Sequence, residues 1–449
     1  MASLITSLGA ARVRIFRPFT AVNRCFTTAD RRFKTADRRF QTVDRRFKTA
    51  DRRFQTVDRR FTKIDRAVAD EVLRFSLDAP VQEAFTPPSS WYRNPGIHEL
   101  EADTVWRNNW VAVGRTDQVS TPGAFFTGTI GREPFIVSSD RSNTLRAFYN
   151  VCCHHGNVVE WREAGEASEF VCCYHGWTYA LDGRLTKPTK LRGIKNFVAA
   201  QNGLKPIGVR TWGPLVFLRL AGYPDEDDFD QKVGPLAQEL EKMGFTSGMR
   251  HICRRQYQLR CNWKLIVDNA ADSGYHLEYV HRDLSSNLDL STFRTEVGDI
   301  YNMQVCIGKD DNDNTLKRQR VGKKAVYSCI YPNLLVNRYG PWLDINILLP
   351  LGPDRSLMIY DFYLKESFAE EMSETELAEF IQQSLKDSDQ VQQEDTRVCE
   401  GVQRGMESTA FDVGRYAPGP EMPVHAFHLQ LARDLREGLE HHESMYSNN

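Results

Sequence analysis

The chain has 449 residues and a formal net charge of −1, a length that suits two domains behind a separate N-terminal region. It has no apolar run of about 18 residues, so we expect no membrane-spanning helix, and we expect no nucleic-acid partner. The 10 cysteines come without the apolar segment of a secretory signal, which argues against a disulfide scaffold and for an intracellular or organellar protein.

The first 29 residues have the composition of a transit peptide. They contain Arg12, Arg14, Arg17 and Arg24, several Ser and Thr, and no acidic residue, as organellar targeting segments do. The alternative is an ordinary flexible N-terminus. A transit peptide would place the soluble mature protein in the chloroplast stroma or the mitochondrial matrix, which this composition does not distinguish.

Residues 30–66 repeat a seven-residue unit, Thr-Ala/Val-Asp-Arg-Arg-Phe-Lys/Gln. Its apolar residues recur with alternating spacings of three and four, which predicts a helical heptad seam. A tandem duplication with no role in assembly is an equal alternative, because Phe at every a position fits a dimer seam poorly. We expect a helical or linker region over 67–106 to follow. The seam residues are Phe33, Ala36, Phe40, Val43, Phe47, Ala50, Phe54, Val57, Phe61 and Ile64.

From 107 to 215, short runs of β-forming residues broken by Gly and Pro predict a small β-sandwich. Within it the pattern C-x-H-x17-C-x2-H occurs at Cys152, His154, Cys172 and His175. Such a set predicts a Rieske [2Fe–2S] cluster, in which two His replace Cys on one iron and raise the reduction potential. A structural zinc site is the alternative. Cys153 and His155 also satisfy C-x-H, so spacing alone leaves the register of the first arm open.

A basic stretch follows the second arm of this pattern, in an otherwise acidic body. We expect it to steer an acidic electron-donor protein to the cluster. A solvated loop is the alternative. Its basic residues are Arg184, Lys187, Lys190, Arg192 and Lys195.

Residues 216–440 mix strands with helices near 371–406 and 423–437, which predicts an α+β catalytic domain with a curved antiparallel sheet. We expect residues 441–449 to form a tail.

His276 and His281 are five apart, so they converge only at a helix end or a wide turn. Non-haem Fe(II) sites use two His and one carboxylate on one face. Asp395 is our candidate for the carboxylate, and its neighbour Glu394 is the rival.

Several longer strings are similar to one family. They lie at 172–177, 330–333, 337–342, 399–405 and 414–418. From about 91 to about 435 the chain resembles the Rieske non-haem iron oxygenases of the aromatic-ring-hydroxylating type, and most closely their plant-type choline monooxygenase branch. The resemblance implies a Rieske [2Fe–2S] cluster, a mononuclear non-haem Fe(II), and a carboxylate ligand five residues before a helical Glu, as Asp395 stands to Glu400.

The family's cluster pattern also bears on the register of the first arm. C-x-H-R-G aligns in full if Cys152 and His154 are the ligands, with His155 in the Arg position. Cys173 replaces the Pro of C-P-Y-H-G-W, so the surroundings of the cluster depart from the family's.

The resemblance further implies how the sites communicate. In many relatives an acidic residue three before the first iron His bridges to the cluster of a neighbouring subunit. Ser273 has that place here, and the resemblance to choline monooxygenases, which carry their Asp one residue earlier, implies that the bridge falls to Asp272. A homo-oligomer follows, with a trimer favoured.

The activity implied is oxidation of choline to betaine aldehyde hydrate, the first step of glycine betaine synthesis, with O2 and reduced ferredoxin or a separate reductase. Carnitine, glycine betaine or an aromatic compound are alternative substrates. The non-enzymatic alternative is an oligomerising scaffold with a structural metal site.

Aromatic faces are expected to recognise a small quaternary amine, because its trimethylammonium group has no N–H to donate. Tyr331, Tyr339 and Trp342 lie close in sequence and form the candidate cage. Packing beside a strand explains them at least as well.

Overall fold

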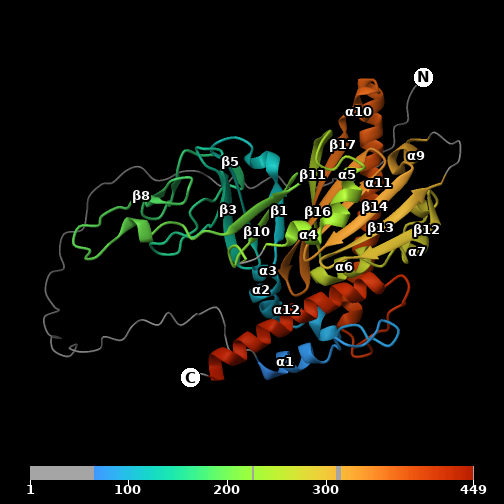
Figure 1. The fold of residues 1–449 in the computed structure, drawn as a ribbon, viewed down its shortest axis with the longest axis horizontal. Helices are drawn as coiled ribbons and strands as arrows, with labels where there is room; N and C mark the ends of the chain where they lie inside the picture. The colour runs from blue at the N-terminus through green and yellow to red at the C-terminus, as the bar shows by residue number, and fades with distance from the viewer. Residues whose placement is uncertain (1–64, 225–226, 310–314, 448–449) are drawn as a thin grey trace, which may run out of the picture. The chain divides into compact units, whose positions relative to one another are not determined.

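The computed structural model describes residues 65–224, 227–309 and 315–447 (Figure 1). The expected transit peptide and nearly all of the heptad segment lie outside the described residues. No helix in the described part is both long and apolar enough to cross a membrane.

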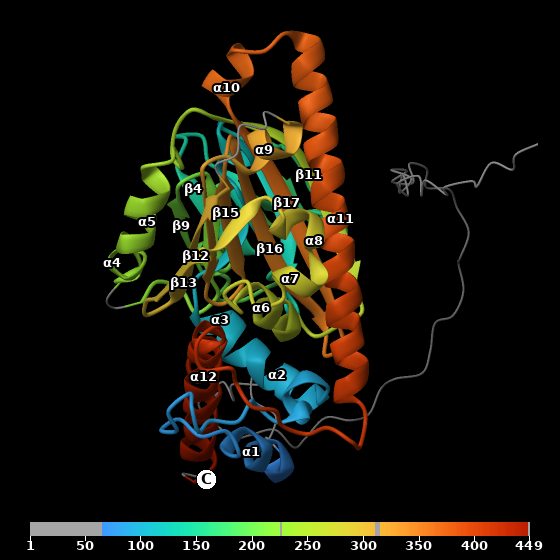
Figure 2. The ribbon, with the colours of Figure 1, turned by 90° about the vertical axis from the view of Figure 1, so that its right-hand side faces the viewer.

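Short helices at the start of the described chain contact its last helix. These elements are α1 (Arg66–Leu73), η1 (Ser89–Tyr92), α2 (Pro95–Asp103), α3 (Val105–Asn108) and α12 (Met422–Ser447). Asp65 and Asn94 accept hydrogen bonds from the first turns of α1 and α2, as N-cap residues do. Helices α1, α2 and α3 pack along α12, beneath the large sheet in the view of Figure 2.

Three small antiparallel sheets make up the region of the Cys-His pattern. Its strands are β1 (Val111–Arg115), β2 (Ala124–Ile130), β3 (Glu133–Ser139), β4 (Leu145–Tyr149), β5 (Ala164–Glu166), β6 (Phe170–Val171), β7 (Thr178–Tyr179), β8 (Leu185–Lys187), β9 (Gly208–Trp212) and β10 (Leu215–Arg219). Short η2 (Thr116–Val119) and η3 (Ala199–Gln201) interrupt them. The strand orders are β1-β10-β9, β4-β3-β2-β5 and β6-β7-β8. This confirms the expected small β domain.

A seven-stranded antiparallel sheet forms the centre of the second half. Its strands are β11 (Met249–Leu259), β12 (Leu288–Val297), β13 (Tyr301–Gly308), β14 (Lys324–Ile330), β15 (Leu334–Tyr339), β16 (Trp342–Gly352) and β17 (Arg355–Lys365). Their order is β11-β17-β16-β15-β14-β13-β12, and every neighbouring pair is antiparallel. The α+β fold with an antiparallel sheet is therefore confirmed.

Helices cover both faces of this sheet. They are α4 (Phe229–Lys232), α5 (Gly234–Glu241), α6 (Trp263–Ala270), α7 (Leu277–Val280), α8 (Arg282–Ser285), α9 (Leu316–Val321), α10 (Glu366–Glu370) and α11 (Glu374–Met406). Ile345 and Ile347 of β16 pack with residues of α4 and α5, so the residue between them, Asn346, points to the other face. Figure 2 shows α4 and α5 on one side of the sheet and α11 on the other.

A buried carboxylate joins β1 to the seven-stranded sheet. Asp361 of β17 is fully buried and accepts hydrogen bonds from Arg115 of β1 at 2.7 Å, and from Arg254 at 2.7 Å and His251 at 3.0 Å, both of β11. Burial disfavours the charged form, but these donors outweigh it and lower the pKa of Asp361 to about 2. The ion cluster therefore fixes one strand of the β domain against the catalytic sheet.

Replacing Asp361 by Asn should lower the free energy of unfolding by about 3–5 kcal/mol near neutral pH, because Arg115 and Arg254 keep their charges without the buried anion. The folded pKa lies below the ordinary 3.8, so the carboxylate stabilises the fold above about pH 4 and loses this effect as the pH falls toward 2. The difference in free energy of unfolding between the wild type and Asp361→Asn, measured with urea, should therefore become smaller from pH 7 to pH 3. Asp117→Asn is the matched control: it pairs with the same Arg115, but its side chain is 53% exposed, so its effect should be small. Equal losses of unfolding free energy in Asp361→Asn and Asp117→Asn would contradict this account.

Candidate functional site

The two loops of the Cys-His pattern have the same backbone geometry. The N–H of Gly156 donates to the carbonyl of Cys152 at 2.9 Å, and that of Gly176 donates to the carbonyl of Cys172 at 2.9 Å. Both glycines have φ of +73°, a conformation that other residues rarely adopt. The loops therefore hold their first cysteines at equivalent positions.

Cys152 and Cys172 are buried side by side. They are 2% and 1% exposed and belong to one buried cluster, and the thiol of Cys152 lies close enough to lower the pKa of Cys172. Burial opposes ionisation of Cys172, but the backbone of Tyr174 and the side chain of Asn157 donate to its sulfur and lower the pKa below the ordinary value. The hydroxyl of Tyr179 lies 3.2 Å from the sulfur of Cys152. The donors to Cys172 favour its thiolate, which is the form that binds metal.

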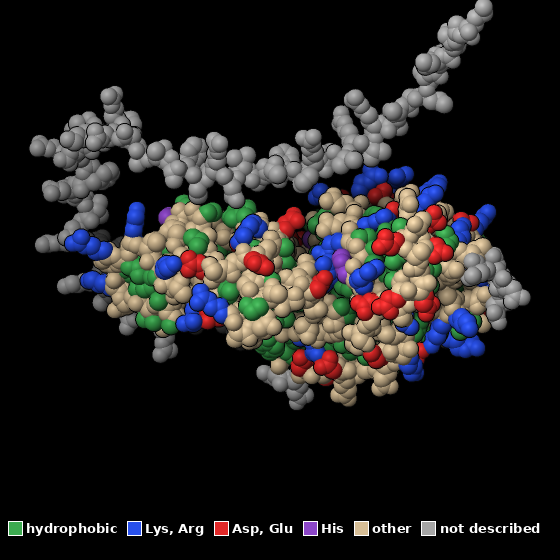
Figure 3. Space-filling view, turned by 90° about the horizontal axis from the view of Figure 1, so that it is seen from above, with side chains coloured by type: hydrophobic (Ala, Val, Ile, Leu, Met, Phe, Trp, Pro, Cys, Tyr) green, Lys and Arg blue, Asp and Glu red, His purple; other side chains and the backbone are tan. Residues whose placement is uncertain are grey.

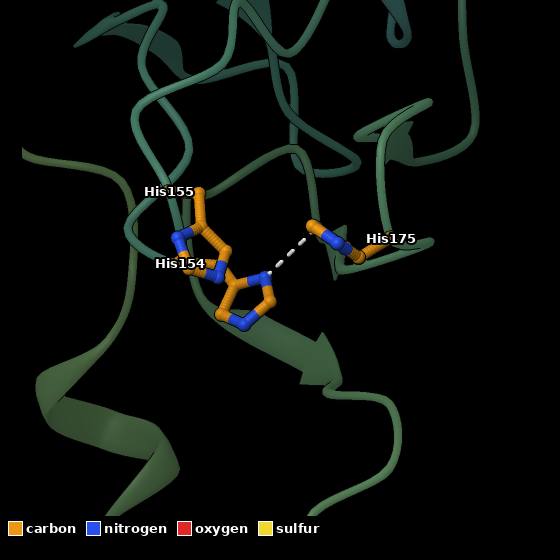
Figure 4. Close-up of side chains that lie close together, drawn as sticks. All are labelled: His154, His155 and His175. Carbon is orange, nitrogen blue, oxygen red and sulfur yellow. Dashed lines mark hydrogen bonds between the residues drawn. The ribbon is translucent and has the colours of Figure 1, made fainter. Parts of the chain in front are cut away.

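Histidines from the same two loops meet on the outer side. Figure 4 shows His154 and His175 facing each other, with 3.2 Å between their Nδ1 atoms, and the ring of His155 beside them. Among the described residues these three His form one group of ligand atoms within 4.8 Å, without either sulfur. The thiols and the imidazoles thus form two separate groups, which suits two irons with different ligands. A single zinc ion would hold its four ligands only about 3.4–3.8 Å apart.

The alternative first-arm cysteine points elsewhere. Cys153 is exposed, and its thiol donates to the carbonyl of Gly203 at 2.8 Å. The structure therefore brings Cys152 beside Cys172. His155 stays close to His175, so the choice of His154 as ligand remains a prediction.

A second group of metal-binding side chains surrounds α7. His276 is the residue before this four-residue helix and His281 is the residue after it. The two ends of the helix therefore explain how side chains five residues apart can converge. The Oδ1 atom of Asp395, on α11, lies 2.9 Å from Nε2 of His281 and 3.9 Å from Nε2 of His276. Two imidazoles and one carboxylate thus converge from one side, as in a two-His-one-carboxylate site.

Two further carboxylates bind the outer nitrogens of these imidazoles. Asp272 lies 2.7 Å from Nδ1 of His276, and Glu394 lies 2.7 Å from Nδ1 of His281. The Nδ1–H groups donate to them, which leaves both Nε2 atoms free for a metal. Burial opposes the charge of His281, but Asp395 and Glu394 outweigh it and raise its pKa. Glu394, the rival ligand, therefore lies on the wrong nitrogen to share the metal, and Asp395 is the better candidate.

A cavity of about 140 Å³ opens between this group and the sheet. His276, His281 and Asp395 line its metal end. Most other walls are apolar, and the aromatic rings among them are Phe293, Tyr327 and Tyr360. The space and its lining suit a small, partly apolar ligand.

The structure does not bring the expected cage of Tyr331, Tyr339 and Trp342 to this cavity, since none of the three lines it. Tyr339 and Trp342 pair at the closed end of the β15–β16 hairpin, so their closeness in sequence follows from the turn. The hydroxyl of Tyr339 donates to Asp344 in an adjoining cavity of about 70 Å³. Phe293, Tyr327 and Tyr360 are the rings that face the metal side.

Three contacts of the sites were not predicted from the sequence. The side chain of Asn157 donates to the sulfur of Cys172, the hydroxyl of Tyr179 accepts from the N–H of Cys153, and the side chain of Asn269 donates to Asp395 at 2.9 Å. Asn269 stands seven residues before His276 on α6, so its position beside the site could have drawn attention. Nothing in the sequence distinguishes Tyr179 from an ordinary strand residue.

Comparisons with known proteins agree with this geometry. The family model described as Rieske [2Fe-2S] domain matches residues 109–198, and the model described as Ring hydroxylating alpha subunit (catalytic domain) matches residues 247–437. Choline monooxygenase, chloroplastic, of Arabidopsis thaliana is 41% identical over 378 residues, which cover 81% of this chain and 86% of that protein. The enzyme of the same name from Spinacia oleracea is 34% identical over 367 residues, 81% of this chain and 82% of that protein. A solved structure of the quaternary ammonium Rieske monooxygenase CntA has the same fold, with a TM-score of 0.67 and 21% identity over 78% of this chain and 95% of that chain.

We expect His154→Ala to remove the EPR signal of the reduced cluster and His155→Ala to keep it, because the loop geometry and the position of Cys152 favour the first register. The two residues are adjacent and both are partly or fully accessible, so each variant controls for the other. The opposite result would shift the ligand set by one residue.

Glu394→Ala should weaken binding of Fe(II) to the second site about 10–100-fold, because His281 loses the group that fixes its ring and tautomer. Glu394→Gln keeps an acceptor oxygen and should lose less. Titration of the metal-stripped second site with Fe(II), with the cluster spectrum as control, measures both. An unchanged affinity in the Ala variant would mean that the 2.7 Å contact has no role in metal binding.

Proposed function

The chain belongs to the Rieske non-haem iron oxygenases, in the group of the plant choline monooxygenases, and we propose that it oxidises choline to betaine aldehyde hydrate. The observation that carries the proposal is the presence, in one chain, of a two-Cys-two-His site and a separate two-His-one-carboxylate site beside a small cavity. An electron carrier alone would need only the first site. A structural metal would need neither the cavity nor the second site.

The residues present fit the two groups that this family carries. Cys152, Cys172, His154 and His175 would hold the [2Fe–2S] cluster, and His276, His281 and Asp395 would hold the mononuclear iron. When bound, the cluster supplies electrons one at a time and the iron activates O2.

The chain's own residues hold the site in position for this chemistry. Asp272 and Glu394 keep the Nδ1 protons of the two iron-site imidazoles, so that both Nε2 atoms face Asp395. Asn269 donates to Asp395 and fixes the orientation of its carboxylate. The apolar walls of the cavity exclude bulk water from the reacting carbon.

Tyr327 and Tyr360 replace the earlier cage as the candidates for recognition of the ammonium group. Both line the cavity, and each favourable cation–ring contact contributes about 0.5–2 kcal/mol. The cationic end of choline would lie against these rings, with its hydroxyl-bearing carbon toward the metal end.

Reduced ferredoxin, or a separate reductase, is our proposed electron donor. Arg184 and Lys187 of the basic stretch pair with Asp182 and Glu169, so the approach of a donor depends more on Lys190, Arg192 and Lys195. Figure 3 shows Lys and Arg side chains beside exposed hydrophobic ones on the end of the molecule that carries β8. A donor with acidic and apolar contacts suits that surface.

A homotrimer in a plastid completes the proposal. Asp272 is our candidate for the bridge to the cluster His of a neighbouring subunit, and its second carboxylate oxygen has no hydrogen-bond partner among the described residues. The curated relatives compared above are named chloroplastic, which favours the chloroplast over the mitochondrion.

Asp395→Ala should abolish oxidation of choline and keep the cluster spectrum, because the carboxylate serves the mononuclear iron and not the electron carrier. Product is measured as betaine aldehyde after reduction by ferredoxin under O2, with carnitine and glycine betaine as competing substrates. Asp387→Ala is a matched control on the same helix: its carboxylate accepts from Gln383 and lies outside the metal-side cavity. Full activity in the Asp395 variant, or preference for another substrate, would overturn the proposal.

A further inference from the structure

A buried carboxamide without a hydrogen bond faces the metal-side cavity. Asn346, in the middle of β16, is 1% exposed and lines the cavity together with His276, His281 and Asp395. Its Oδ1 atom has no partner in the described part of the chain. Buried polar atoms are almost always paired, so an orphan in a cavity indicates a partner that binds there.

The other buried polar side chains of this cavity are already used within the fold. Ser328 donates to the carbonyl of Val336, Gln304 to that of Ala270, and Gln392 to Thr396. Among the described lining residues, Asn346 is the one with a buried oxygen left unpaired. The amide offers one acceptor and two donors, whichever way it is turned.

The strand register shows which side chains lie beside Asn346 on the sheet face that lines the cavity. It pairs with Leu335 of β15 and with Tyr360 of β17, so the three side chains form one row on the face toward α11. Burial, and after it the charge of Asp395, raises the pKa of Tyr360, which puts this row near the metal-binding carboxylate. An oxygen atom bound to Asn346 would have apolar neighbours and the metal group close by.

We infer that Asn346 accepts a hydrogen bond from the hydroxyl group of an amino-alcohol substrate and so turns the hydroxyl-bearing carbon toward His276, His281 and Asp395. The inference rests on the proposed function and adds to it a positioning residue that decides specificity. The hydroxyl is the only hydrogen-bond donor of choline. Aromatic rings recognise any trimethylammonium group, whereas Asn346 distinguishes an alcohol from an alkyl chain of the same size.

The test compares choline with n-propyltrimethylammonium, in which a methyl group replaces the hydroxyl. Dissociation constants are measured anaerobically by calorimetry on the metal-loaded enzyme. The wild type should bind choline about tenfold or more tightly than the analogue, since the analogue leaves the amide unpaired. In Asn346→Leu this ratio should fall to near one, through weaker binding of choline and not of the analogue.

Two further variants separate the hydrogen bond from general damage. Asn346→Asp keeps an acceptor oxygen and should keep the preference for choline. Ser328→Ala removes a hydroxyl from the same cavity, but one that already donates to Val336, so the preference should survive. If Asn346→Leu does not fold, Asn346→Ala removes the same amide without added bulk.

Turnover provides a second readout, because a substrate held at the wrong angle is oxidised less often per O2 consumed. Asn346→Leu should therefore form less betaine aldehyde per O2 than the wild type at saturating choline. An unchanged binding ratio in this variant, or an equal fall in Ser328→Ala, overturns the inference and leaves choline oxidation standing. A wild type that neither binds nor oxidises choline overturns the proposed function, and this inference with it.

Discussion

The Nδ1 protons of His276 and His281 are held by Asp272 and Glu394, and this constraint determines which atoms of the site can bind a metal. An imidazole whose Nδ1 proton is fixed has only Nε2 to offer. Glu394 and Asp395 are adjacent on α11, and their side chains leave the helix about 100° apart. They reach opposite nitrogens of the same His281 ring only because α11 passes directly beside it. The long helix therefore sets both the metal-binding face and the orientation of one of its ligands.

The sequence could predict those parts of the two sites that depend on local geometry. The five-residue spacing of His276 and His281 requires a helix end, and α7 supplies two ends within four residues. The C-x-H-x-G and C-x2-H-G arms each place a glycine four residues after a cysteine, and both loops close with the same hydrogen bond. Such features depend on a few neighbouring residues, so they appear in the sequence before any tertiary contact is known.

Long-range contacts could not be predicted in this way. Glu394 and His281 are separated by 113 residues, and nothing near Glu394 shows that it orients a ligand. The expected cage differs from the observed lining for the opposite reason. Tyr339 and Trp342 are close in sequence because they flank a hairpin turn, whereas Tyr327 and Tyr360 reach the cavity from separate strands of the sheet. Asn346 is a similar case, since its alternation with Ile345 and Ile347 predicts only that it faces the other side.

The position of the metal site depends finally on helices that precede both matched domains. Glu101 of α2 is fully buried, and it accepts hydrogen bonds from Lys264 at 2.5 Å and from the indole of Trp263 at 2.8 Å. Burial lowers the pKa of Lys264, so its ammonium group depends on the carboxylate beside it. Both donors belong to the first turn of α6. Near the other end of α6, Asn269 donates to Asp395, and Asp272 follows two residues after the helix. A catalytic segment without α2 would keep every candidate ligand in its sequence, but it would lack the buried ion pair that orients α6 and, through α6, the imidazole of His276.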